Sequence, residues 1–246
     1  MACARVVVTP LPAGPALLTA VTWNMNAGRG DLARLVADLE QASPGVPQSH
    51  AYVLLLQEAA ESELDAIAGP RGWATCFVPV RGVGGRVRGN AIVSSLALRD
   101  RRVVPLSRER QPRAAASAWI DLAGRPLFVA SVHLENRVSW WRGGLLSDTA
   151  RRRQVDGLLR ALPADASGIL GGDFNTWLGP NEPAWQALAR RFADTPDPMR
   201  IPTFHDRLVL DHVFFDLPEG WRASTRVTSD TYESDHHPVI AVVTGD

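Results

Sequence analysis

Short apolar runs, bounded by glycine, proline or charged residues, recur along this 246-residue chain. Many are rich in Val, Ile and Phe and have the usual length of a β-strand, about five to eight residues. Because one short strand buries little surface by itself, such runs must pair into sheets. The expected strands are Arg5–Thr9, Leu17–Asn24, Tyr52–Gln57, Thr75–Val80, Ala91–Ser95, Ala115–Asp121, Leu127–His133, Gly168–Gly171, Val209–Phe215 and Val239–Val243.

Helical spacing of apolar residues is found in fewer places. Residues Asp31–Gln41 and Thr149–Leu162 each put leucine and valine on one face, and shorter helices are expected at Glu61–Ala68 and Glu182–Phe192. No low-complexity linker or internal repeat divides the chain. We therefore expect a single α/β domain over residues 1–246, with helices packed outside the sheets.

Composition limits the classes of function. The formal net charge is zero, so the protein has no overall field to attract nucleic acid or an acidic membrane, although an enzyme with a local basic patch stays compatible. All 26 basic residues are arginine, which excludes P-loop and Schiff-base chemistry because both need lysine. The cysteines, Cys3 and Cys76, are too few for a disulfide framework.

Neither a membrane span nor a signal peptide is expected. No apolar run approaches the ~20 residues that a bilayer-spanning helix needs. Pro10, Pro12 and Pro15 interrupt the apolar segment near the N-terminus. We therefore expect a cytoplasmic protein, and a monomer.

Polar residues lie at the ends of the apolar runs or inside them. A buried carboxylate or imidazole costs several kcal/mol unless it is paired, hydrogen-bonded or bound to metal. A satisfied polar group in the core explains any one of these residues, but their recurrence at strand edges indicates a common site. The eight residues are Asn24, Glu58, His133, Asp173, Asn175, Asp211, Asp235 and His236.

Local spacing suggests how some of these side chains are oriented. Asp173 and Asn175 are two residues apart, so an extended backbone points both to one side. Asp211 is adjacent to His212, and alternation directs these two to opposite faces of a strand. Pro238 restricts the backbone of the preceding residue and so fixes the approach of the Asp235-containing segment.

Three chemical classes of hydrolase compete for this residue set. No GxSxG nucleophile elbow is present, which argues against a serine hydrolase. The six histidines show neither HxxxH nor HxH spacing, which argues against zinc. Carboxylate and amide oxygens suit a hard cation, so the sequence predicts Mg²⁺ or Mn²⁺.

Seven motifs follow one another in an order that resembles the endonuclease/exonuclease/phosphatase superfamily, the DNase-I-like fold. The resemblance covers about residues 17–243, nearly the whole chain, and implies a four-layer α/β sandwich of two mixed β-sheets flanked by helices. Its strongest signals are GDFN and SDHHP. The motifs are Thr22–Asn24, Gln57–Glu58, Gly89–Ile92, Ser131–Leu134, Gly172–Asn175, Leu210–His212 and Ser234–Pro238.

The resemblance implies a divalent-metal-dependent attack of water on phosphorus. By resemblance, Asn24 and Glu58 help to hold Mg²⁺ or Mn²⁺, with Glu58 as the principal ligand. Asp173 and Asn175 position the attacking water and the phosphate, and Asp173 is a candidate general base.

The remaining roles are also implied by the resemblance. His236 is a catalytic imidazole, and Asp235 either orients it or contacts the metal. His133 binds a phosphoryl oxygen or protonates the leaving group, and we expect Asp211 to pair with it, fixing its tautomer and raising its pKa. Asn90 anchors the site or contacts phosphate.

Substrate choice is not decided by fold. A nuclease acting on a phosphodiester is the first interpretation. A phosphatase or phospholipase-C-type hydrolase of inositol phosphates or sphingomyelin-like headgroups is the second, and an inactive phosphate-binding module is a third. The intact set of acid, amide and histidine residues argues against the third.

Several further segments could contact substrate. The basic loop Arg81–Gly89 either contacts a phosphate backbone or is a solvated hairpin turn, and one of Arg110 and Arg113 is expected to reach substrate. The tryptophans in Asn136–Asp148 either stack on a base or cap the core. Arg151–Arg153 is interpreted as a solvated helix face.

Overall fold

The computed structural model describes residues 16–41, 50–80, 87–109, 111–136, 146–196 and 200–245. Helices form at α1 (Leu32–Gln41), α2 (Glu61–Arg71), α3 (Leu146–Ala161) and α4 (Pro183–Arg191). The strands are β1 (Ala16–Asn24), β2 (His50–Ala59), β3 (Ala74–Val80), β4 (Arg88–Ser94), β5 (Arg99–Pro105), β6 (Ala114–Leu122), β7 (Arg125–His133), β8 (Gly168–Asp173), β9 (Asp211–Asp216), β10 (Arg222–Val227) and β11 (Val239–Gly245).

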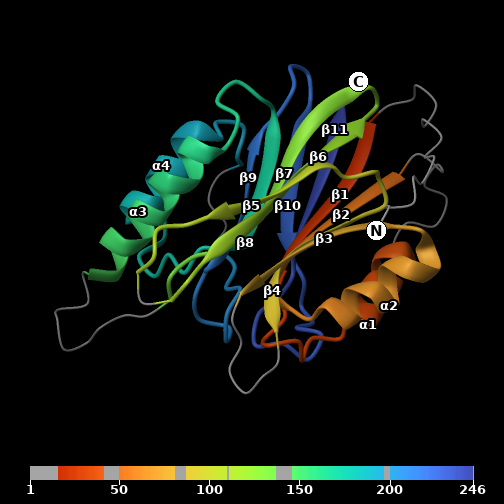
Figure 1. Cartoon of the computed structure of the whole chain (residues 1–246), viewed down its shortest axis with the longest axis horizontal. Helices are drawn as coiled ribbons and strands as arrows, with labels where there is room; N and C mark the ends of the chain where they lie inside the picture. The colour runs from red at the N-terminus through yellow and green to blue at the C-terminus, as the bar shows by residue number, and fades with distance from the viewer. Residues whose placement is uncertain are drawn as a thin grey trace, which may run out of the picture.

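These strands form two mixed sheets, which confirms the predicted fold class. One sheet has six strands in the order β10-β11-β1-β2-β4-β3, and the other has five in the order β5-β6-β7-β8-β9. Within them β1 pairs with β2 and β7 pairs with β8 in parallel, and the remaining strand pairs are antiparallel. Figure 1 shows the sheets stacked between two helix pairs.

Three hydrophobic clusters hold the four layers together. The largest lies between the sheets and joins Leu18 and Leu55 of one sheet to Val129 and Phe215 of the other. A second cluster packs α1 and α2 on the outer face of the six-stranded sheet. The third packs α3 and α4 on the outer face of the five-stranded sheet. The alternating apolar residues of each strand therefore serve both the inner and the outer layers.

Two strands, β5 and β10, were not predicted from the sequence, and both lie at sheet edges. β5 and β10 carry mainly polar residues, with mostly exposed side chains in β5. An edge strand has a neighbour on one side only and often carries charge, so it lacks an apolar run. The expected strand Arg5–Thr9 lies outside the described residues.

All four expected helices are present, with small differences at their ends. Asp31 precedes α1, and its Oδ1 accepts a hydrogen bond from the backbone N–H of Arg34 (2.9 Å), which explains where that helix begins. In the described part of the chain no helix is long and apolar enough to cross a membrane.

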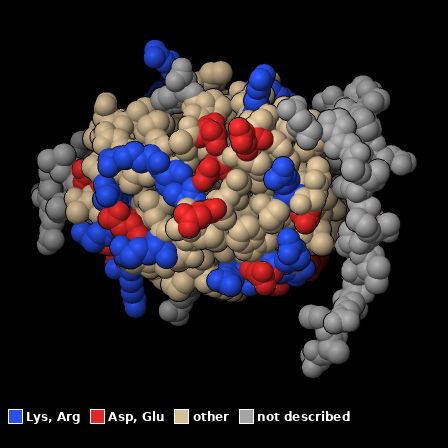
Figure 2. All heavy atoms as spheres, turned by 90° about the horizontal axis from the view of Figure 1, so that it is seen from above, with Lys and Arg blue, Asp and Glu red and all other residues tan. Residues whose placement is uncertain are grey.

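Charges are mixed on the end of the sandwich that Figure 2 shows, where β11 ends. Acidic side chains gather near the middle of this face and arginines lie around them, so no large area has one sign. This distribution agrees with the zero net charge and provides no broad basic surface at this end of the molecule.

A buried polar network joins the two sheets at the level of the strand ends. Nε2 of Gln57 donates to Oγ1 of Thr22 (3.2 Å) and to Oγ of Ser131 (3.0 Å), which belongs to the facing sheet. Gly171 lies nearby, where a Cβ atom would come within 2.7 Å of Leu55 Cδ1. A side chain at this glycine would therefore collide with the side chains of Leu55 and Thr22 on the facing sheet.

Strand register brings three of the expected site residues into one row. His133 ends β7 and pairs with Asp173 at the end of β8, and Asp173 in turn pairs with Asp211 at the start of β9. On the facing sheet Asn24 pairs with Gln57, one residue before Glu58. Both sheets therefore present polar groups at the same end of the sandwich.

Candidate active site

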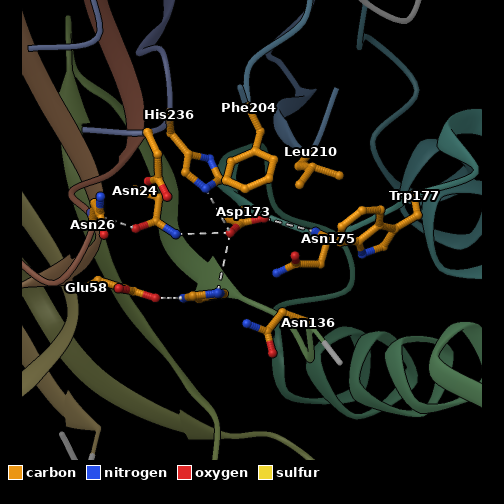
Figure 3. A pocket seen from close by; sticks show the side chains of 12 residues that line it. Asn24, Asn26, Glu58, Asn136, Asp173, Asn175, Trp177, Phe204, Leu210 and His236 are labelled. Carbon is orange, nitrogen blue, oxygen red and sulfur yellow. Dashed lines mark hydrogen bonds and ion pairs between the residues drawn. The ribbon is translucent and has the colours of Figure 1, made fainter. Parts of the chain in front are cut away.

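A cavity of about 200 Å³ opens at these strand ends (Figure 3). Seven of the eight expected residues line it, and Asp211 lies directly behind His236. Three lining residues, Asn26, Trp177 and Phe204, were not predicted because they stand in loops without a recognisable pattern, and Leu210 belongs to a predicted motif but was not predicted to line the site. The full lining is Asn24, Asn26, Glu58, His133, Asn136, Asp173, Asn175, Trp177, Phe204, Leu210, Asp235 and His236.

Asp173 is the centre of this arrangement, as Figure 3 shows. Its Oδ2 accepts a hydrogen bond from Nδ2 of Asn24 (3.0 Å) and lies 3.4 Å from Nε2 of His133 and 3.9 Å from Nε2 of His236. Burial raises the pKa of Asp173, and the nearby Asp211 carboxylate raises it further. Opposing effects of His236 and of the hydrogen bonds leave this pKa at about 6.

Asp211 pairs with His236, so the expected pairing with His133 is wrong. Oδ2 of Asp211 lies 2.7 Å from Nδ1 of His236, and both groups are buried. The physical reason is the sheet order: β8 with Asp173 lies between β7 and β9, which places His133 and Asp211 two strands apart. Neighbouring strands are about 4.8 Å apart, so a direct bond is out of reach.

This pairing keeps His236 protonated. Burial by itself would lower the pKa of the imidazole, but the charge and hydrogen bond of Asp211, with the charges of Asp173 and Asp235, raise it to about 10. The ring packs against Phe204 with centroids 4.6 Å apart, and Nε1 of Trp23 donates to the His236 backbone carbonyl (3.0 Å). His236 is therefore a fixed imidazolium that faces the cavity.

His133 has the opposite electrostatic character. Burial lowers its pKa well below 6.5, and the positive charges of Arg113 and His236 lower it further. The predicted rise in the pKa of His133 is therefore wrong. Nδ1 of the ring lies 3.9 Å from Oε1 of Glu58, so the neutral imidazole stands between Glu58 and Asp173.

Asn175 reaches the cavity by a different route from the one expected. The strand ends at Asp173, and Asn175 has a φ of 50°, so the backbone between them is not extended. The backbone N–H of Asn175 donates to Oδ1 of Asp173 (3.0 Å), and its Nδ2 donates to the Leu134 carbonyl (3.3 Å). Asn26 and Glu58 also have a positive φ, 46° and 54°, so this backbone conformation is found at three residues that line the cavity.

Glu58 and Asn24 lie on the six-stranded sheet side of the cavity. Oε2 of Glu58 accepts a hydrogen bond from the Ala27 backbone (2.8 Å), and the side chain is 35% exposed. Oδ1 of Asn24 accepts a bond from the Asn26 backbone (3.0 Å), which directs its Nδ2 to Asp173. Asn24 therefore orients the central carboxylate in addition to any contact with metal.

The described residues fit a hard divalent cation. Ligand atoms of Asp173, Asp211 and His236 lie within 4.8 Å of one another, and the buried Oδ1 of Asp211 has no hydrogen-bond partner among the described residues. His236 is unsuitable as a ligand because a protonated imidazole has no free lone pair. Glu58 and Asn24 offer a carboxylate and an amide oxygen at the cavity, the ligand types that a hard cation prefers, so their contact with metal stays a prediction.

Asp235 does not orient the His236 ring, since Asp211 does so. Its Oδ1 lies 3.5 Å from the Ser234 hydroxyl and its Oδ2 lies 4.0 Å from Nε2 of His205. The carboxylate lines the cavity and is partly exposed. Contact with metal therefore stays a prediction for Asp235.

Asn90 and Arg113, the two residues predicted to bind substrate, do not line the catalytic cavity. Asn90 is buried, and its Nδ2 donates to the Ala114 carbonyl (2.7 Å), so it links β4 to β6 and does not line the cavity. Arg113 lies close enough to Asp173 and Glu58 for their charges to oppose the lowering of its pKa by burial. The Nε of Arg113 is buried without a partner among the described residues. Arg110 and the tryptophans Trp140 and Trp141 lie outside the described residues, as do residues 81–86.

A buried ion pair supports the two loops next to the site. Arg151 donates from Nε and Nη2 to the two oxygens of Glu182, both at 2.8 Å, with side-chain exposures of 3% and 0%. Nη1 of Arg151 also donates to the Glu135 carbonyl (3.3 Å), and Glu182 accepts from the Leu178 backbone (3.2 Å). The interpretation of Arg151 as part of a solvated face is therefore wrong.

We expect Arg151→Met to lower the free energy of unfolding by about 3–5 kcal/mol, because Glu182 would keep a buried charge without its partner. Urea unfolding measures this change. Arg160→Met, at an exposed position of the same helix, is the matched control and should change stability little. Equal, small effects of both substitutions would contradict the assignment.

Fold and site together define a DNase-I-like sandwich with a carboxylate–imidazole centre at the strand ends. The sequence matches the Endonuclease/Exonuclease/phosphatase family over residues 21–236. The chain therefore belongs to this family, whose members usually hydrolyse phosphoesters. A comparison with curated proteins found no match.

Solved structures with the same fold include several proteins of low sequence identity. An endonuclease/exonuclease/phosphatase from Beutenbergia cavernae has a TM-score of 0.70 and 19% identity, covering 93% of this chain and 71% of that one. The human Nocturnin catalytic domain with bound sulfate has a TM-score of 0.68 and 19% identity, covering 92% and 94%. A humanized TDP2 from D. rerio has a TM-score of 0.63 and 14% identity, covering 94% and 99%. At these identities the likeness shows the fold.

Proposed function

We propose that this protein is a Mg²⁺- or Mn²⁺-dependent phosphodiesterase that acts on nucleic acid. The observation that carries the proposal is the central Asp173, held by Asn24 and flanked by His133 and by the His236–Asp211 pair. Family membership supports phosphoester hydrolysis in general. A comparison of diester and monoester hydrolysis tests the choice of a diester.

Asp173 is the proposed general base. A carboxylate with a pKa of about 6 is deprotonated at neutral pH and is more basic than an exposed one. The oxygen of the attacking water forms a bond to phosphorus while the bond to the leaving oxygen breaks, and the proton of the water passes to Asp173. The leaving oxygen keeps the electron pair of the broken bond and takes a proton from solvent. Asn24 and the backbone of Asn175 hold the two carboxylate oxygens in place.

The two histidines have different proposed tasks. His236 carries a positive charge, so it offsets negative charge that develops on the phosphoryl oxygens. His133 is neutral, so it offers one N–H as a hydrogen-bond donor to the phosphate. Glu58, with Asn24 and Asp235 as further candidates, would hold a divalent cation, which would supply additional positive charge to the phosphate when bound.

Hydrolysis of bis(p-nitrophenyl) phosphate tests this function. We expect turnover with Mg²⁺ or Mn²⁺, loss of turnover in EDTA, and recovery when the metal is added back. p-Nitrophenyl phosphate, a monoester, should be hydrolysed more slowly. Absence of turnover with either ester and either metal would favour a phosphate-binding module on the same fold.

Glu58→Gln is expected to raise the metal concentration needed for half-maximal activity at least about tenfold, because a neutral amide replaces a charged ligand. Metal titration of the initial rate measures this change. Glu61→Gln, at an exposed position in α2, is the control and should leave the titration unchanged. An identical metal dependence of wild type and Glu58→Gln would remove Glu58 from the metal site.

A further inference from the structure

A second cavity, of about 450 Å³, adjoins the catalytic cavity. Its described lining consists of Trp177, Phe204, His205, Arg207 and Leu208, and the first two of these residues also line the catalytic cavity. Figure 3 shows Phe204 beside His236 and Trp177 beyond Asn175. A group attached to a phosphate in the catalytic cavity would therefore lie next to the second cavity.

The two cavities differ in chemistry. The catalytic cavity is lined mainly by carboxylates, amides and imidazoles, whereas the second has two aromatic rings and a leucine with two basic side chains. Trp177 is 39% exposed although it is a large apolar side chain, and the adjacent Leu178 is more exposed still. Exposed apolar surface beside a polar site is typical of a surface that contacts a ligand.

Both aromatic walls are tied to catalytic residues. The backbone N–H of Trp177 donates to the Asn175 carbonyl (3.0 Å), and the following residue is held by the buried Glu182. Phe204 forms a β-bridge with His236 and packs its ring against that imidazole. The distance from these rings to the reacting phosphate is therefore set by short, local connections.

We infer that the second cavity binds a planar aromatic group, a nucleobase, next to the scissile phosphate, with Trp177 as its stacking surface. This inference rests on the proposed phosphodiesterase function. The catalytic cavity, about 200 Å³, is smaller than ligand pockets of about 300–1,000 Å³, whereas the second, about 450 Å³, lies within that range.

The lining also distinguishes a base from a polyol headgroup. An inositol ring presents several hydroxyl groups that need acceptors, and no carboxylate or carboxamide side chain is among the described residues of this cavity. Every base has a π-face for Trp177, and Arg207 and His205 can donate to base acceptor atoms or to a neighbouring phosphate.

Two short single-stranded oligonucleotides of one sequence test the inference, one intact and one with an abasic analogue beside the cleaved phosphate. For the wild type kcat/KM should be higher with the base present. The ratio of kcat/KM for the intact oligonucleotide to kcat/KM for the abasic one measures the contribution of the base. Trp177→Ala should lower this ratio by about 10- to 100-fold, because base stacking on an aromatic ring is lost. Trp177→Phe should retain most of the ratio, and Val103→Ala, exposed on β5, is the control.

Each outcome separates this inference from the proposed function. An unchanged ratio in Trp177→Ala overturns the subsite. Hydrolysis of bis(p-nitrophenyl) phosphate without cleavage of the oligonucleotides overturns the base-binding role while the phosphodiesterase stands. Absence of hydrolysis of every diester overturns both.

Discussion

Asp173→Asn is expected to lower kcat by about 10³-fold, within the range of about 10²–10⁴ for loss of a general base. Asparagine has nearly the same shape, and its one side-chain oxygen can still accept the hydrogen bond from Asn24, although the bond from the Asn175 backbone is lost, so the fold should persist. It cannot accept a proton from water at neutral pH. Initial rates with bis(p-nitrophenyl) phosphate measure the loss, with Asp165→Asn, at an exposed position, as the control.

The same substitution should make the metal-free protein more stable. The pKa of Asp173 is raised from 3.8 to about 6 in the folded state, so the proton binds more tightly there than in the unfolded chain. Stability from this group is present below pH ~3.8 and is lost as the pH rises through about 6. Above that range, in EDTA, Asp173→Asn should unfold at a higher urea concentration than wild type. A variant that is less stable and keeps its activity would contradict both expectations.

His236→Gln should lower kcat by about 10²–10³-fold, because a neutral amide replaces the imidazolium that faces the phosphate. The catalytic contribution requires a positive charge, which Asp211 maintains through its hydrogen bond. His50→Gln is the control, since His50 begins β2 and does not line the cavity. Near wild-type turnover of His236→Gln would exclude His236 from the reaction.

The charge on His236 also predicts a pH dependence of stability. Its pKa is raised from 6.5 to about 10 in the folded state, so its stabilising contribution is present below pH ~6.5 and is lost as the pH rises through about 10. In EDTA the free energy of unfolding of wild type should therefore fall across this window. His236→Gln should lack this fall, and Asp211→Asn should lower the imidazole pKa when followed by NMR.

Much of the fold could be predicted because interior strands carry apolar runs. The strands around Leu55 and Val129 are buried on both faces, so hydrophobicity alone locates them. Edge strands such as β5 have no apolar run, because most of their side chains are polar and exposed to solvent. The resemblance carried by the order of the motifs then predicted two mixed sheets flanked by helices.

The candidate site was predicted as a set of residues, and its internal contacts were not. Spacing along the chain does not report that β8 separates His133 from Asp211, because strand order is a property of the sheet. The pairing of Asp211 with His236 depends on the loop between β10 and β11, which places His236 beside β9 although the two residues are 25 positions apart in sequence. The burial of Arg151 likewise depends on Glu182, 31 residues away.

The buried contact of Gln57 with Ser131 has a consequence for how the protein becomes active. Asn24 and Glu58 belong to one sheet, whereas His133 and Asp173 belong to the other, so neither sheet holds a complete set of reacting groups. A partly folded state with both sheets formed but separated would be inactive. Recovery of hydrolysis during refolding would therefore follow the docking of the sheets, and a larger side chain at Gly171 would delay that step most directly.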